Sequence, residues 1–353
     1  MTTTIEVMPR ESGKFVISLD FELNWGVRDQ QTLEQYGTNI LGVRQAIPAM
    51  LDVFTEYGLR VTWATVGFLF CKTKPDLLAH LPVVRPNYID PNLSPYLALD
   101  SIGDDEATDP YHFGYSLLEQ VRHTPGQELA THTFCHYYCL EQGQTSESFR
   151  HDLQAAIDVA QEHDLELRSL VFPRNQYNPA YMGICEEVGI TSYRGNESSW
   201  IYKERNEKQQ ALYKRGARLI DAYLNMSGVN CYSLDEIAKS FPYNIPASRF
   251  LRPWSRRFRL LEGLRMQRIL RGMEYAAQHG QVFHLWWHPH NFGVNLIENI
   301  AVLRQIAEHF RWLQTRYGME SLSMGNIAEY LQKRQQKSKD SVGSLQNDQE
   351  QQA

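Results

Sequence analysis

The chain has 353 residues, with 35 lysines and arginines against 41 aspartates and glutamates, a formal charge of −6, and a hydrophobic fraction of 42%. This is an ordinary globular composition, and its acidic balance argues against a general nucleic-acid-binding protein. No run approaches the roughly 18 consecutive apolar residues of a membrane span, and the first residues lack the apolar core of a secretory signal. We therefore expect a cytoplasmic protein, either free or at the inner membrane surface, whose five scattered cysteines are reduced thiols.

Strand-like and helix-like segments alternate along most of the chain. A buried-strand pattern covers residues 14–20, a helical pattern covers 41–57 and ends at Gly58, and a second strand covers 60–69. Helix and strand pairs follow at 115–122 and 128–131, 146–163 and 169–172, 179–188 and 191–194, and 264–279 and 282–287, before helices at 295–317 and 325–331. This alternation predicts an α/β fold with a parallel sheet, open or closed into a barrel.

Some segments depart from that rhythm. Residues 1–13 form an N-terminal extension, and a single domain is expected over 14–331. Residues 85–112 are rich in Pro, Asp and Asn, so we expect an irregular loop there. Residues 332–353 are polar, with almost nothing apolar, and we expect this tail to be disordered.

Residues 249–271 hold eight arginines together with Trp254 and Phe258, a local exception in an acidic chain. Such a segment could bind the diphosphate of a nucleotide-linked or lipid-linked sugar, with Arg252 as our candidate contact. It could instead make peripheral contact with anionic lipid headgroups, or form a solvated helix face. The sequence leaves these three alternatives open.

Two clusters of polar residues follow predicted strands. His132 and His136 are four residues apart, so on a helical turn they would share a face and could reach one divalent metal. Asp20 and Glu22 are two residues apart and point to the same side of an extended chain. One carboxylate could complete a metal site and the other could act as a general base. The alternatives are ordinary core or surface histidines and a salt-bridged acid pair.

A third cluster, His284, His288 and His290, places two histidines, His288 and His290, at the end of the apolar strand 282–287. The carboxyl ends of parallel strands are where α/β folds place catalytic groups. We therefore expect these three clusters to meet at one edge of the sheet.

Four segments in chain order resemble the motifs of the polysaccharide deacetylases, the NodB-homology carbohydrate esterases. They are SLDFE at 18–22, THTFCH at 131–136, SLVFPRNQ at 169–176 and HLWWH at 284–288. The resemblance covers roughly residues 14–330. It implies a distorted (β/α) barrel, in which insertions near 85–112 and 195–262 form walls of the cleft.

The resemblance also implies roles for the first two clusters. Asp20 would be the general base, and His132 and His136 would bind the metal. The family's first motif usually has two adjacent aspartates, but Phe21 occupies the second place here, so Glu22 is the substitute ligand. The implied cofactor is one divalent metal, zinc before cobalt, nickel or manganese.

The last two motifs carry the remaining roles. His288 would protonate the leaving amine. The third motif usually reads Arg-x-Pro, whereas this chain has Pro173 followed by Arg174, so Arg174 is either the partner that orients the base or a surface or substrate-contacting arginine. For the family's fourth motif, Asp221 is the candidate.

Aromatic side chains near the motifs are candidate sugar contacts, since sugar rings stack on aromatic faces, although core packing is the alternative. The candidates are Trp25, Tyr137, Tyr177 and Trp287. The hypothesis is a hydrolase that removes an N-acetyl group from an amino sugar in a precursor of surface-polysaccharide synthesis. The alternatives are a hydrolase of a small cyclic or linear amide, and a metal-free carbohydrate-binding protein with a decayed site.

Overall fold

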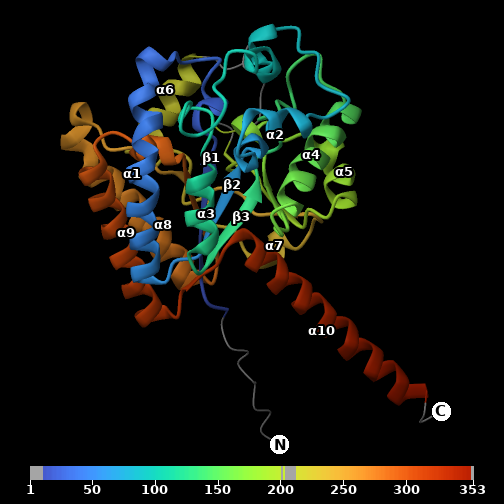
Figure 1. Ribbon diagram of the computed structural model, residues 1–353. Coiled ribbons are helices and arrows are strands. Elements are labelled where there is room, and N and C mark those ends of the chain that lie inside the picture. The colour runs from blue at the N-terminus through green and yellow to red at the C-terminus, as the bar shows by residue number, and fades with distance from the viewer. Residues whose placement is uncertain (1–10, 200–201, 203–211, 351–353) are drawn as a thin grey trace, which may run out of the picture.

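The computed structural model describes residues 11–199, 202 and 212–350 (Figure 1). At its centre lies a parallel sheet with the strand order β6-β5-β4-β3-β2-β1-β8-β7, and β9 pairs with β1. The strands are β1 (Lys14–Phe21), β2 (Val61–Thr65), β3 (Gln127–Thr131), β4 (Ser169–Val171), β5 (Ser192–Arg194), β6 (Tyr243–Asn244), β7 (Arg249–Phe250), β8 (Val282–Trp287) and β9 (Glu320–Ser321).

One short segment, residues 243–251, joins the two edges of this sheet. Its first half donates backbone hydrogen bonds to carbonyls along β5, and the N–H groups of Ser248 and Leu251 donate to carbonyls of β8. The sheet is thereby closed into a distorted barrel, as the resemblance implied. The sequence did not predict β6 and β7, because two-residue strands carry no periodic pattern.

Helices surround the barrel (Figure 1), and α1 packs against α9, which in turn packs against α8. Their bounds are α1 (Leu33–Tyr57), α2 (Lys74–Ala79), α3 (Tyr115–His123), α4 (Ser146–Gln161), α5 (Met182–Glu187), α6 (Leu212–Asp221), α7 (Leu234–Ile237), α8 (Glu262–His279), α9 (Leu296–Tyr317) and α10 (Met324–Glu350). Helix α1 begins earlier than predicted, after the capping side chain of Thr32, and it ends where Gly58 adopts φ 65°. None of the helices within the described residues is long and apolar enough to cross a bilayer.

Strand alternation separates two buried environments. In β1, Phe15 and Leu19 pack into the apolar layer beneath the helices, whereas Val16 belongs to a second apolar cluster that includes Met324 and Leu331 of α10. This second cluster also contains Ala64 of β2 and Val282 of β8, so it lies on the interior face of the sheet. The polar residues Ser18 and Asp20 share the parity of Val16, so they lie further along the interior, toward the carboxyl ends of the strands.

Helix α10 runs from Met324 to Glu350 and projects from the body of the molecule (Figure 1). Its first turns are anchored in the core by Ile327 and Leu331, and the Gln, Lys and Arg residues that follow have high intrinsic helix propensity. Residues 351–353 lie outside the described part of the chain, and the expected disorder of the polar tail 332–353 stays a prediction.

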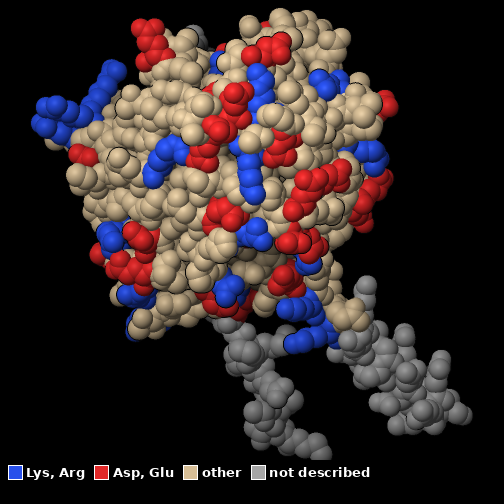
Figure 2. Space-filling model, in the orientation of Figure 1, with Lys and Arg blue, Asp and Glu red and all other residues tan. Residues whose placement is uncertain are grey.

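The two predicted insertions differ in structure. Residues 85–112 contain only short 3-10 turns, as expected, and His112 ties the segment to the barrel by bonding Asp109 and Asn24. Residues 195–262 carry α6, α7, β6 and β7. On the face shown in Figure 2, acidic and basic side chains are interspersed, so this face presents no field of a single sign.

Candidate active site

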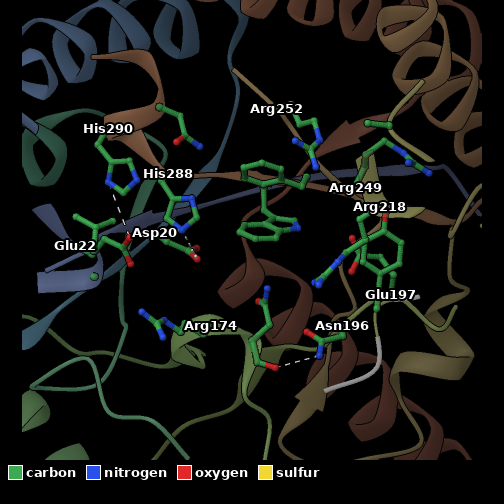
Figure 3. A pocket seen from close by; sticks show the side chains of 18 of the residues that line it. Asp20, Glu22, Arg174, Asn196, Glu197, Arg218, Arg249, Arg252, His288 and His290 are labelled. Carbon is green, nitrogen blue, oxygen red and sulfur yellow. Dashed lines mark hydrogen bonds and ion pairs between the residues drawn. The ribbon is translucent and has the colours of Figure 1, made fainter. Parts of the chain in front are cut away.

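The carboxyl ends of β1, β3 and β8 bring three of the predicted clusters together. Asp20 and Glu22 point into the interior from β1 and the residue after it, and His288 follows β8. The His288 Nε2 atom lies 3.7 Å from Asp20 Oδ2 and 3.6 Å from Glu22 Oε1. The ring of His290 stacks on His288 with 4.9 Å between centroids. Figure 3 shows these four side chains on one side of a common cavity.

Glu22, His132 and His136 form a group suited to a divalent metal. The Glu22 Oε2 atom lies 3.4 Å from His132 Nε2 and 3.2 Å from His136 Nε2, and all three side chains are buried. His132 Nδ1 is 2.8 Å from the carbonyl of Val171, so Nδ1–H donates and Nε2 keeps its lone pair. That buried Nε2 has no hydrogen-bond partner among the described residues. Two imidazoles and a carboxylate, with one imidazole held in the ligating tautomer, fit a metal such as zinc.

The histidines sit on a strained loop, which corrects the predicted helical turn. Thr133 and His136 adopt positive φ angles of 63° and 60°, a conformation that non-glycine residues rarely take. Asp152 of α4 supports the loop by accepting hydrogen bonds from the N–H groups of Phe134 (2.8 Å) and Cys135 (3.2 Å). Asp152 was not among the predicted site residues, although an acidic side chain on the apolar face of the predicted helix 146–163 could have indicated its supporting role.

Arg194, rather than Arg174, contacts the candidate base. Both of its terminal nitrogens donate to the two carboxylate oxygens of Asp20, each at 2.7 Å. Burial alone would raise the pKa of Asp20, but Arg194, with His132 and His288, lowers it. Arg174 is bonded to Asp29 and stacks on a tyrosine ring, because the turn after β4 directs its side chain away from Asp20. Arg174 still borders the cavity, and its catalytic role stays a prediction.

A buried chain of hydrogen bonds supports Arg194 from inside the barrel. Ser18 Oγ accepts a hydrogen bond from Arg194 at 3.0 Å and lies 2.8 Å from His284 Nε2. His284 Nδ1 is 3.1 Å from the carbonyl of Ile245, so its proton sits there and the Ser18 hydroxyl donates to Nε2. Burial, together with the charge of Arg194, lowers the pKa of His284 to about 3. His284 is therefore a neutral support beneath the site.

The cavity has a volume of about 690 Å³ and extends from the carboxylates to a group of arginines. Figure 3 shows Asp20, Glu22 and His288 on one side and Arg218, Arg249 and Arg252 on the other. The rings of Phe250 and Trp286, 4.6 Å apart, also line it.

No family model matches the chain, and no curated protein matches it. Among solved structures, a candidate polysaccharide deacetylase from Mycobacterium smegmatis has a TM-score of 0.58 at 12% identity, covering 95% of each chain. A candidate polysaccharide deacetylase from Pseudomonas aeruginosa PAO1 has a TM-score of 0.52 at 10% identity, covering 90% of this chain and 89% of its own. The chain has the polysaccharide deacetylase fold. The PuuE allantoinase is also similar, with a TM-score of 0.52 at 10% identity and 91% of each chain covered.

Within the polysaccharide deacetylase fold, strand parity decides which aromatic residues reach the cavity. Trp287 was a predicted sugar contact, but it is fully buried beneath the helices, and its neighbour Trp286 lines the cavity instead. Trp25 and Tyr137 are also core residues, exposed by no more than 1%. Tyr177 stacks on Tyr193 at 5.2 Å and is not among the residues that line the cavity. Alternate strand residues face opposite sides, so adjacent tryptophans cannot share one surface.

The arginine-rich segment divides into buried and exposed parts. Arg249 and Arg268 both pair with the buried carboxylate of Asp221, at 3.1 and 2.9 Å. Asp221 is therefore the centre of a structural ion cluster, and its assignment to the fourth motif stays a prediction. Arg252 lines the cavity, its role as a substrate contact stays a prediction, and Arg256 is exposed.

Proposed function

We propose that the protein is a metal-dependent N-deacetylase that acts on an amino sugar carried by a nucleotide- or lipid-linked precursor. The observation that carries this proposal is the arrangement of Glu22, His132 and His136 beside Asp20 and His288 at one cavity. The polysaccharide deacetylase fold supports a deacetylase-type hydrolase.

The buried carboxylate and imidazoles would hold the metal. A divalent cation, when bound there, supplies a water of lowered pKa and polarises an amide carbonyl. Asp20 would accept the proton of that water, because the contacts with Arg194 keep its carboxylate ionised and fix its direction.

His288 would donate the second proton. Its side chain is 24% exposed, so it reaches the cavity. Its Nε2 lies 3.7 Å from a carboxylate oxygen of Asp20 and 3.6 Å from one of Glu22. An imidazolium there can protonate the amine as the C–N bond breaks. The products are acetate and a free amino sugar.

The test is acetate release from acetylated sugar nucleotides by the zinc-loaded protein, measured beside His136→Ala. We expect about one equivalent of metal and measurable acetate release in the wild type, and the loss of both in the variant, because a ligand is removed. Metal-free wild-type protein after reconstitution would instead support a carbohydrate-binding protein with a decayed site.

A second candidate is hydrolysis of a small cyclic amide, which the likeness to an allantoinase favours. The same assay separates the two. Ring opening of a cyclic ureide or imide without acetate release from any amino sugar would select this second candidate.

A further inference from the structure

The arginines on the far side of the cavity are not required by the chemistry proposed above. We define this arginine arm as Arg218, Arg249, Arg252 and Arg265, all of which line the cavity. Arg249 pairs with Asp221, Arg265 pairs with Glu262, and Arg218 also has a partner. Arg252 differs from them, because no carboxylate in the described part of the chain forms an ion pair with it.

The surroundings of Arg252 favour an anion. Burial lowers the pKa of Arg252, the charges of Arg218 and Arg265 lower it further, and Tyr223 and Tyr202 oppose this, because loss of solvent and nearby positive charge both disfavour an isolated cation. Glu197 is the acidic side chain lining this side of the cavity. Burial raises the pKa of Glu197 to about 7, so near neutral pH a part of the Glu197 side chains is neutral. Neutral Glu197 does not compensate the positive charge of Arg252.

The strand register places Arg252 close to the reacting group. In the pairing of β7 with β8, Phe250 is opposite Trp286, and the N–H of Leu251 still donates to the Trp286 carbonyl. Arg252 follows Phe250 by two residues, as His288 follows Trp286, so both point to the cavity side. Figure 3 shows Arg252 and His288 facing one cavity from neighbouring segments.

A sugar phosphate requires this kind of proximity. In a 2-acetamido sugar 1-phosphate, the acetamido group and the phosphate are on adjacent ring carbons, so an anion subsite must lie beside the hydrolytic centre. A sugar ring stacked against Trp286 and Phe250 would extend from His288 to Arg252. Guanidinium groups bind phosphate through paired, charge-assisted hydrogen bonds.

We propose that the arginine arm, through Arg252, binds the phosphate or diphosphate on carbon 1 of the substrate sugar. This inference rests on the proposed deacetylase function, and it deepens it by naming the residue that would recognise the phosphate on carbon 1 of the precursor. The nucleoside and lipid carriers share this phosphate chemistry.

The experiment compares kcat/KM for UDP-N-acetylglucosamine with that for the neutral methyl glycoside of N-acetylglucosamine. We expect the wild type to prefer the phosphorylated substrate, and Arg252→Ala to reduce this preference roughly 10- to 100-fold, the range for a hydrogen bond to a charged group. Arg252→Lys should recover part of it. Arg256→Ala, an exposed arginine of the same segment, is the matched control and should change the preference less than about twofold. An unchanged preference in a folded Arg252→Ala variant would overturn the proposal.

Direct binding separates this subsite from the deacetylase function. Calorimetry with UDP and with inorganic pyrophosphate is run on the full chain, wild type and Arg252→Ala. Binding that is lost in the variant, without acetate release from any substrate, would keep the subsite and reject the proposed function. Acetate release without any role of Arg252 in binding would do the reverse. An N-acetylglucosamine diphosphate on a short prenyl chain, used better than the nucleotide sugar, would assign the lipid carrier.

Discussion

Asp20 is a buried carboxylate whose charge is stabilised by a specific partner. It is 3% exposed, and an isolated anion at that depth would be costly to solvate. The two-point contact with Arg194 offsets this cost and orients the carboxylate, and Ser18 holds the guanidinium in turn. The orientation of the proposed base thus depends on Arg194 and, through it, on Ser18.

Asp20→Asn should abolish turnover and retain the metal, since the base is lost and the ligands remain. We expect kcat to fall by about 10²- to 10⁴-fold, the usual contribution of a positioned base. Elemental analysis of the folded variant beside an acetate-release assay measures both. Near-normal turnover would show that another group takes the proton.

Arg194→Lys should reduce kcat by roughly 10²-fold, because a single ammonium cannot reproduce the two-point contact with Asp20. Arg174→Lys should have a much smaller effect, because the contacts of Arg174 are with Asp29 and Tyr138. Steady-state measurement of kcat for both variants shows which arginine orients Asp20. A larger loss for Arg174→Lys would restore Arg174 as the residue that orients the base.

At the scale of elements, the two candidate metal-binding histidines lie on a loop whose backbone conformation needs support from another element. Two positive φ angles within residues 132–136 are unfavourable, so another element must fix the loop. Helix α4 does so through Asp152, whose carboxylate accepts two consecutive loop N–H groups. Burial raises the pKa of Asp152 to about 6, so this support is strongest above that pH, when the carboxylate is ionised.

Asp152→Asn should weaken metal affinity about 10- to 100-fold, the range seen when outer groups that orient ligands are removed. The asparagine amide would direct a donor at one loop N–H, and the loop would relax. Competition with a metal-binding dye measures the affinity. The exposed Asp158→Asn on the same helix is the control, and equal affinity in both variants would contradict the role of Asp152.

For the whole molecule, one buried ion cluster joins the cavity wall to the barrel. Asp221 at the end of α6 binds Arg249 on β7 and Arg268 on α8, and it also accepts hydrogen bonds from Ser227. Three elements that are distant in sequence are tied by one carboxylate. Removing one partner from such a cluster leaves buried charges without compensation.

The Asp221 cluster should make stability depend on pH. Burial raises the pKa of Asp221, but the Ser227 hydrogen bond and the charges of Arg249 and Arg268 lower it to about 2, against about 3.9 in an unfolded chain. Its stabilising contribution is therefore complete above about pH 4 and is lost as the pH falls through 2. Asp221→Asn should cost about 3–5 kcal/mol in the free energy of unfolding near neutral pH. Urea unfolding from pH 2.5 to 7 should show the gap to wild type narrowing in acid, and a gap independent of pH would contradict this assignment.

The sequence by itself determined the α/β alternation, because a buried strand such as residues 14–20 and an amphipathic helix have different hydrophobic periods. It also predicted that Asp20, Glu22, His132, His136 and His288 would lie together, since the carboxyl ends of parallel strands meet at one edge. Only the tertiary structure decided that Arg194 contacts Asp20, that Trp286 lines the cavity whereas Trp287 is buried, and that residues 243–251 close the barrel. Each of those depends on contacts between residues far apart in sequence, and local pattern carries no information about which distant side chain completes a pair.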